Sequence, residues 1–171
     1  MNRHFENTTP TELHINLNGI PAPQGSKRAF TRTNKTTGKT TVSLVESAGD
    51  KVKTWRDDVR NAAIDAANKT GWTAPHGAVT VDLVFYLPRP KSHYRTGTNA
   101  GLLRNTAPTA HTTKPDRDKL ERSTHDALTS AGVIHDDSNI IGGSVWKHYA
   151  DGRPPGATIT IRNYTRIHTE D

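Results

Sequence analysis

Four of the five aspartates in the segment KPDRDKLERSTHDALTSAGVIHDDSNI, residues 114–140, stand in two pairs. Asp116 and Asp118 flank one residue at the expected start of a helix, and Asp136 and Asp137 are adjacent in the turn expected after it. If the chain after this turn returns beside the start of the helix, the four carboxylates meet. Such a cluster is tolerable only with a cation among the acids or with some of them protonated. Mg²⁺ suits the site because it takes hard oxygen ligands and is often shared with substrate phosphate, and we expect Mn²⁺ to substitute for it.

Ordinary structural roles account for the same residues. Aspartate is favoured in the first turn of a helix by the unpaired N–H groups, and it is common in turns. Asp118, Arg122 and Asp126 are successive i, i+4 neighbours on a helix. They form either a solvent-exposed ladder of ion pairs, each worth about 0.2–0.5 kcal/mol, or a site in which Arg122 holds a scissile phosphate. Spacing alone favours the ladder. His125 and His135 are interpreted as ordinary polar residues, because their spacing does not pair them as a zinc site.

The elements that must position these acids follow from the periodicity of the apolar residues. Alternation predicts strands over 13–17, 79–87 and 157–164, and a small basic hairpin over 28–45. Three- and four-residue spacing predicts helices over 47–69 and from Pro115 to Gly132. Residues 140–149 are predicted to form one further strand, in which Gly142 and Gly143 mark a bulge or a close backbone approach. This order indicates an α+β fold, with one mixed sheet and two main helices packed on it.

Length and charge restrict the organisation and the partners of the chain. A chain of 171 residues suits one domain, with residues 1–11 flexible and 88–114 a long basic loop of the kind that is usually functional. The net charge of +6 favours a polyanionic partner. The absence of cysteine excludes disulfides, thiolate zinc sites and cysteine nucleophiles. Because no apolar run suits a signal peptide or a membrane span, we expect a soluble cytoplasmic protein with no membrane partner.

The dense, ordered motif in PDRDKLERSTHDAL and TSAGVIHDDSNI resembles the core motif of the RusA family of Holliday-junction resolvases, which occurs in bacteria, phages and prophages. The likeness extends outward more weakly. PAPQGSKRAF resembles the family's N-terminal Pro-rich basic loop, KTWRDDVRNAA its first helix, and VDLVFYLPRPKSH the strand leading to its basic loop. Most of residues 13–161 is covered, except the middle of the long loop.

The resemblance implies roles for individual residues. The family's metal-binding acids correspond to Asp116, Asp118 and Asp137, with Asp136 as an adjacent helper. The family's essential lysine falls at Arg122, where this chain departs from the pattern. Arginine keeps the charge and a grip on phosphate, but it does not deprotonate usefully as a proton donor.

The resemblance also implies an activity and a partner. We expect a homodimer that resolves four-way DNA junctions by Mg²⁺-dependent, paired symmetric incisions, in recombination and repair, within a bacterial or phage-infected cell. Basic residues are expected to hold the DNA backbone: Lys27, Arg28, Arg89, Lys91, Arg95, Lys114, Arg117 and Lys119, with Arg32, Lys35 and Lys39 on the hairpin. The alternatives are a nuclease for forks or flaps, and a non-catalytic module that binds branched DNA. The complete acid set disfavours the second.

Overall fold

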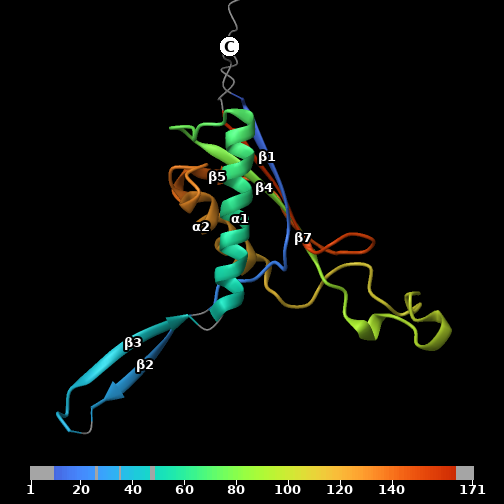
Figure 1. Cartoon of the computed structure of the whole chain (residues 1–171), viewed down its shortest axis with the longest axis horizontal. Helices are drawn as coiled ribbons and strands as arrows, with labels where there is room; N and C mark the ends of the chain where they lie inside the picture. Colours follow the sequence, from blue (N-terminus) through green and yellow to red (C-terminus); the bar gives the residue numbers. More distant parts are fainter. Residues whose placement is uncertain (1–9, 26, 35, 47–48, 165–171) are drawn as a thin grey trace, which may run out of the picture.

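A mixed β-sheet forms one layer of the computed structural model, which describes residues 10–25, 27–34, 36–46 and 49–164 (Figure 1). Its strands are β1 (Glu12–Asn18), β4 (Val79–Leu87), β5 (Ile140–Gly142), β6 (Val145–Tyr149) and β7 (Gly156–Asn163). Strand β7 lies between β1 and β4 and is antiparallel to both, whereas β5 and β6 pair one after the other with the far side of β4, in parallel. The mixed sheet predicted from the sequence is confirmed.

Only one face of this sheet is apolar, because apolar residues alternate with polar ones along the long strands. Val79, Val81, Leu83, Phe85 and Leu87 of β4 are all buried, and so are Leu13, Ile15 and Leu17 of β1. The opposite face carries residues such as Asp82 and Arg162, which form an ion pair between β4 and β7. The core therefore lies on one side of the sheet.

The two helices α1 (Gly49–Thr70) and α2 (Arg117–Ser130) supply the other half of the core, and they pack against each other. Trp55 of α1 is fully buried beside Phe85, and its indole N–H donates to the Thr124 hydroxyl of α2 at 3.2 Å. Helix α2 lies in the connection from β4 to β5 and β6. A crossover of this kind is what parallel strands require.

Two segments project from the body in Figure 1. Strands β2 (Lys27–Thr33) and β3 (Thr40–Glu46) pair as a separate antiparallel hairpin at the lower left. The loop after β4 projects to the right and contains two short 3₁₀ turns, η1 (Lys91–His93) and η2 (Gly97–Asn99). An antiparallel bridge between Tyr94 and Leu103 closes its outer part. The predicted hairpin is confirmed, and the basic loop 88–114 has local order of its own.

Two boundaries differ from those predicted from the sequence, and some predictions concern residues that the structure does not describe. Helix α2 begins at Arg117 rather than at Pro115, because Asp116 keeps an extended backbone as the N-cap residue. The predicted strand 140–149 is divided into β5 and β6, with Gly143 between them. The flexibility predicted for 1–9, the start of the first helix at residues 47 and 48, and the predicted DNA contact at Lys35 lie outside the described residues.

The division between β5 and β6 has a steric cause at Gly143. Its φ of +145° is rare for residues with a side chain, and a Cβ built there would lie 1.9 Å from the Val81 carbonyl oxygen. This confirms a close backbone approach at the Gly-Gly pair. Across the described part of the chain, no helix is long and apolar enough to cross a membrane.

Candidate active site

Asp116 and Asp118 both lie at the start of α2. Asp116 is the N-cap residue, but its side chain makes no capping hydrogen bond and instead pairs with Lys119 of the first turn at 3.2 Å. Asp118 is exposed in the same turn. Local helix capping by its side chain therefore does not explain Asp116.

The start of α2 is held in place from two sides. Lys147 of β6 donates from its ammonium group to the carbonyl oxygens of Thr113 at 2.9 Å and Pro115 at 2.8 Å. On the other side, the backbone N–H of Gln24 donates to the Lys119 carbonyl oxygen at 2.9 Å. The Ser123 hydroxyl is buried and donates to the Ala22 carbonyl oxygen at 2.8 Å. The sheet and the segment after β1 together fix the position of the start of α2, which carries the two aspartates.

Asp136 and Asp137 open a short 3₁₀ turn, η3 (Asp137–Asn139), between α2 and β5. Asp136 is its N-cap, and one carboxylate oxygen accepts from the Ser138 amide at 2.9 Å. Hydrogen bonds from Ser138 hold the pKa of the Asp136 carboxyl below its usual range. Asp136 thus has a local structural role as the N-cap of η3, and Asp137 follows it as the first residue of this turn.

Asp137 lines a hollow between α2 and the strands β4 and β5, together with Glu121 and His125 of α2. Burial lowers the pKa of the His125 imidazole, while the charges of Glu121, Asp137 and Asp126 act in the opposite direction. The His125 Nε2 atom is buried and has no hydrogen-bond partner among the described residues. The hollow therefore combines two carboxylates with an unsatisfied imidazole nitrogen.

Asp118 belongs to the same side of α2 as this hollow. Asp118, Glu121 and His125 are spaced i, i+3 and i+7, which places them along one side of a helix. Asp118 thus precedes Glu121 by about one turn. Asp137 lines the hollow with Glu121 and His125, whereas Asp118 is not among its lining residues.

The donor chemistry of this region fits Mg²⁺, which commonly binds through one or two carboxylates and completes its shell with water and substrate phosphate. The carboxylates of Glu121 and Asp137 are hard oxygen donors on one hollow. Within the residues described, no group of three His, Cys, Asp or Glu side chains stands close enough to hold an ion by itself. The assignment of Asp116, Asp118, Asp136 and Asp137 as metal ligands stays a prediction.

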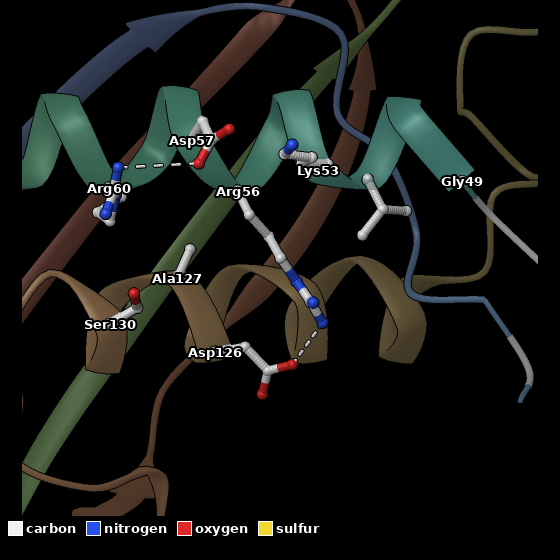
Figure 2. A pocket seen from close by; sticks show the side chains of 9 residues that line it. Gly49, Lys53, Arg56, Asp57, Arg60, Asp126, Ala127 and Ser130 are labelled. Atoms are coloured by element: carbon white, nitrogen blue, oxygen red, sulfur yellow. Dashed lines mark hydrogen bonds and ion pairs between the residues drawn. The ribbon is translucent and has the colours of Figure 1, made fainter. Parts of the chain in front are cut away.

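The charged ladder of α2 does not form as the spacing suggested. Asp126 pairs with Arg56 of α1 at 2.6 Å across the groove between the two helices, as Figure 2 shows. Arg122 is exposed on α2, and no ion pair joins it to Asp118 or Asp126 in the described part of the chain. Its guanidinium faces solvent one turn after Asp118, so a role in holding phosphate stays a prediction.

The residues predicted to bind DNA have different surroundings. Lys91, Lys114 and Arg117 are exposed. Arg95 is exposed too, but it donates to the Leu103 carbonyl oxygen at 3.2 Å and so braces its own loop. For the hairpin residues Lys27 and Arg28, the structure gives a position in β2.

Arg89 lies in a buried cluster at the base of the loop. Its side chain is 4% exposed, pairs with Asp151 at 2.6 Å and covers the Tyr149 ring with its charged carbon 3.8 Å from the ring centre. It also donates to the Pro108 carbonyl oxygen at 2.8 Å. These contacts join the loop to β6, so the prediction that Arg89 contacts DNA gains no support from this arrangement.

Two residues of the region were missed from the sequence. Glu121 follows Asp118 by three positions, a spacing that could have placed it beside the acids. Lys147 had no local signal, because its carbonyl partners Thr113 and Pro115 are 34 and 32 residues away.

Comparison with protein-family models gives a match to the family described as Endodeoxyribonuclease RusA, over residues 21–162. This range includes both helices, strands β2 to β6, the turn η3 and all four paired aspartates. Comparison with curated proteins gives no match. A match over much more than half of the 171 residues agrees with the acid pattern on α2 and η3. The chain therefore belongs to the RusA endodeoxyribonuclease family.

Proposed function

We propose that this nuclease resolves four-way DNA junctions by paired, symmetric incisions, with Mg²⁺ as cofactor, in DNA recombination and repair. The observation that carries the proposal is the family match over residues 21–162, which spans every element of the candidate site. The hollow that Glu121 of α2 lines together with Asp137 of η3 supports it independently.

In the proposed site, Asp118 and Asp137 would hold the ion, with Asp116 at the helix start and Glu121 as a further carboxylate. When bound, Mg²⁺ would polarise the scissile phosphate and lower the pKa of the attacking water. The carboxylates would contribute hard oxygen ligands for the ion, and two of them, Glu121 and Asp137, line the hollow.

The cations around the acids would hold the DNA backbone. Arg117 and Arg122 project from the first turns of α2, and a guanidinium there can bind two phosphate oxygens at once. Lys119 neutralises Asp116 through its ion pair, which reduces the repulsion between the acids and phosphate. Contacts of this kind position DNA without reading its sequence.

The hairpin and the basic loop would extend the DNA surface. Figure 1 shows the two projections on either side of the segment that leads into α2. Exposed cations stand on both, among them Arg32 and Lys39 on the hairpin and Lys91 on the loop. Arms placed in this way would let one subunit contact more than one duplex arm of a junction.

We further propose that the active form is a homodimer. A closed two-fold pair presents identical sites to a pseudo-symmetric junction, and so accounts for two symmetric incisions. The uncovered face of the sheet and the free edge of the hairpin are surfaces on which a second copy could pack.

Incision of four labelled substrates, namely a four-way junction, a fork, a flap and a linear duplex, tests the proposed specificity. We expect the four-way junction to be cut in preference, at symmetric positions in two opposing strands. Asp65→Asn, at an exposed position in the second half of α1, is a matched control that should cut like the parent protein. Equal incision of all four substrates would exclude a resolvase, and preferred cutting of forks or flaps would assign the nuclease to those structures.

A further inference from the structure

Trp146 is the exposed tryptophan of this chain. The sequence has three tryptophans, and the other two are buried with their indole N–H groups engaged. Trp55 donates to the Thr124 hydroxyl, and Trp72 donates to the Val133 carbonyl oxygen at 2.9 Å. Trp146 is 58% exposed on β6. A ring of this size left in solvent gains no stability from burial there, so it is a candidate for contact with a ligand.

The position of Trp146 links it to the candidate active site. It lines a second hollow with Arg117 and Glu121 of α2 and with Gly143, Ser144 and Val145. Glu121 and Gly143 also line the hollow that contains Asp137. The two hollows are therefore neighbours, and Trp146 lies at the edge of the second one, in whose lining Arg117 and Glu121 also take part.

Trp146 has neighbouring rings on the outer face of the sheet. Trp146 and His148 are two residues apart on β6, and their rings lie 6.3 Å apart and only 6° from parallel. His148 is opposite Tyr86 of β4, whose ring lies under the Arg153 guanidinium at 3.5 Å. Trp146 therefore stands at the end of a row of rings on this face, while much of its own ring stays accessible.

We propose that Trp146 is a stacking platform for a DNA base at the branch point, and that it contributes selectivity for branched over linear DNA. The inference rests on the proposed function of the adjacent site. The bases inside a linear duplex are covered by their neighbours, whereas the pairs at a branch point can lose a stacking partner and accept an aromatic ring. Arg117 in the same hollow provides the phosphate contact that such a nucleotide also needs.

Tryptophan emission of the full-length protein in EDTA, where incision is not expected, tests the proposal directly. Because Trp55 and Trp72 are buried, a change on adding DNA should report Trp146. We expect a four-way junction to quench the emission, linear duplex to leave it unchanged, and the junction effect to disappear in Trp146→Phe.

Affinities for the same two DNAs provide a second measurement. Trp146→Ala should bind the junction roughly 5- to 150-fold more weakly, the factor that corresponds to about 1–3 kcal/mol for one stacked base, and Trp146→Phe should lose less. Both variants should bind linear duplex within about twofold of the parent, since this binding depends on phosphate contacts. Equal losses on junction and duplex would overturn the proposal.

The proposal and the function on which it rests fail in different ways. Incision of the junction by the parent protein in Mg²⁺, together with unchanged emission and affinity in the Trp146 variants, would overturn the stacking role alone. Emission that changes with protein concentration in the absence of DNA would place Trp146 in an interface between copies, and would also overturn it. Junction-specific quenching without incision would support stacking and refute the resolvase activity.

Discussion

Gly143 separates β5 from β6 and lines both hollows of the candidate site, so a side chain at this position should damage fold and function together. In Gly143→Ala, the new Cβ would begin 1.9 Å from the Val81 carbonyl oxygen, whereas real Cβ contacts are essentially never closer than 3.0 Å. The two backbones must therefore move apart by about 1.1 Å, the difference between these distances. The φ of +145° adds strain of its own.

The magnitude follows from these two effects. Overpacking costs about 1–3 kcal/mol, and a residue held in a sparsely populated backbone region costs a similar amount. Their sum predicts that Gly143→Ala lowers the free energy of unfolding by about 2–6 kcal/mol. For a chain of this length, a loss of about 3 kcal/mol lowers Tm by roughly 6–12 °C.

Urea unfolding and thermal melting measure this loss, and the adjacent glycine provides the matched control. A Cβ built at Gly142 meets no atom within 4 Å, and its φ lies outside the strained positive range. Gly142→Ala should therefore stay within about 0.5 kcal/mol of the parent. A Gly143→Ala protein with the parental Tm and full junction incision would refute the reasoning that β4 and the β5–β6 connection approach this closely.

Three further predictions concern single residues. Arg122→Lys should keep substantial incision, because the positive charge remains, and Arg122→Ala should lose most of it; an alanine variant with parental rates would leave Arg122 no part in holding phosphate. Lys147→Met removes the hydrogen bonds to Thr113 and Pro115, and should cost about 1.5–3 kcal/mol in urea unfolding; no loss would show that the ammonium does not hold the start of α2. The pKa of the His111 imidazole is lowered, first by burial and then by the charge of Lys147. The unfolded chain therefore binds a proton at His111 more tightly than the folded chain does. The stability that depends on neutral His111 is thus full above about pH 6.5 and declines as the pH falls below it. His111→Asn should therefore show a smaller drop in Tm between about pH 7 and 5 than the parent protein, and an equal drop would contradict this.

The elements of the fold could be predicted because their signals are local. The alternation over 79–87 reflects a strand with one face in the core, and the spacing of Val52, Trp55 and Val59 reflects a helix with one buried side. The division between β5 and β6 is not local, because it depends on where Gly143 meets Val81 of another strand. The late start of α2 depends on the conformation of Asp116, which does not follow from the Pro115 preference alone.

The candidate site was predictable in its residue types more than in its contacts. The order of the acids identified α2 and the turn after it, and the structure places both at one hollow through Glu121 and Asp137. The same sequence reasoning grouped Arg89 with the exposed cations of its loop. Its partner Asp151 is 62 residues away, so no local pattern could have shown that Arg89 is buried.

Mapping of incisions on a labelled four-way junction, with and without Mg²⁺, tests the central claim most directly. The parent protein should cut two opposing strands at symmetric positions only when Mg²⁺ is present. Asp116→Asn and Asp118→Asn should bind the junction in EDTA about as well as the parent protein but fail to cut it. Incision without a divalent ion, or parental rates in either asparagine variant with Mg²⁺, would contradict the assignment of the metal site.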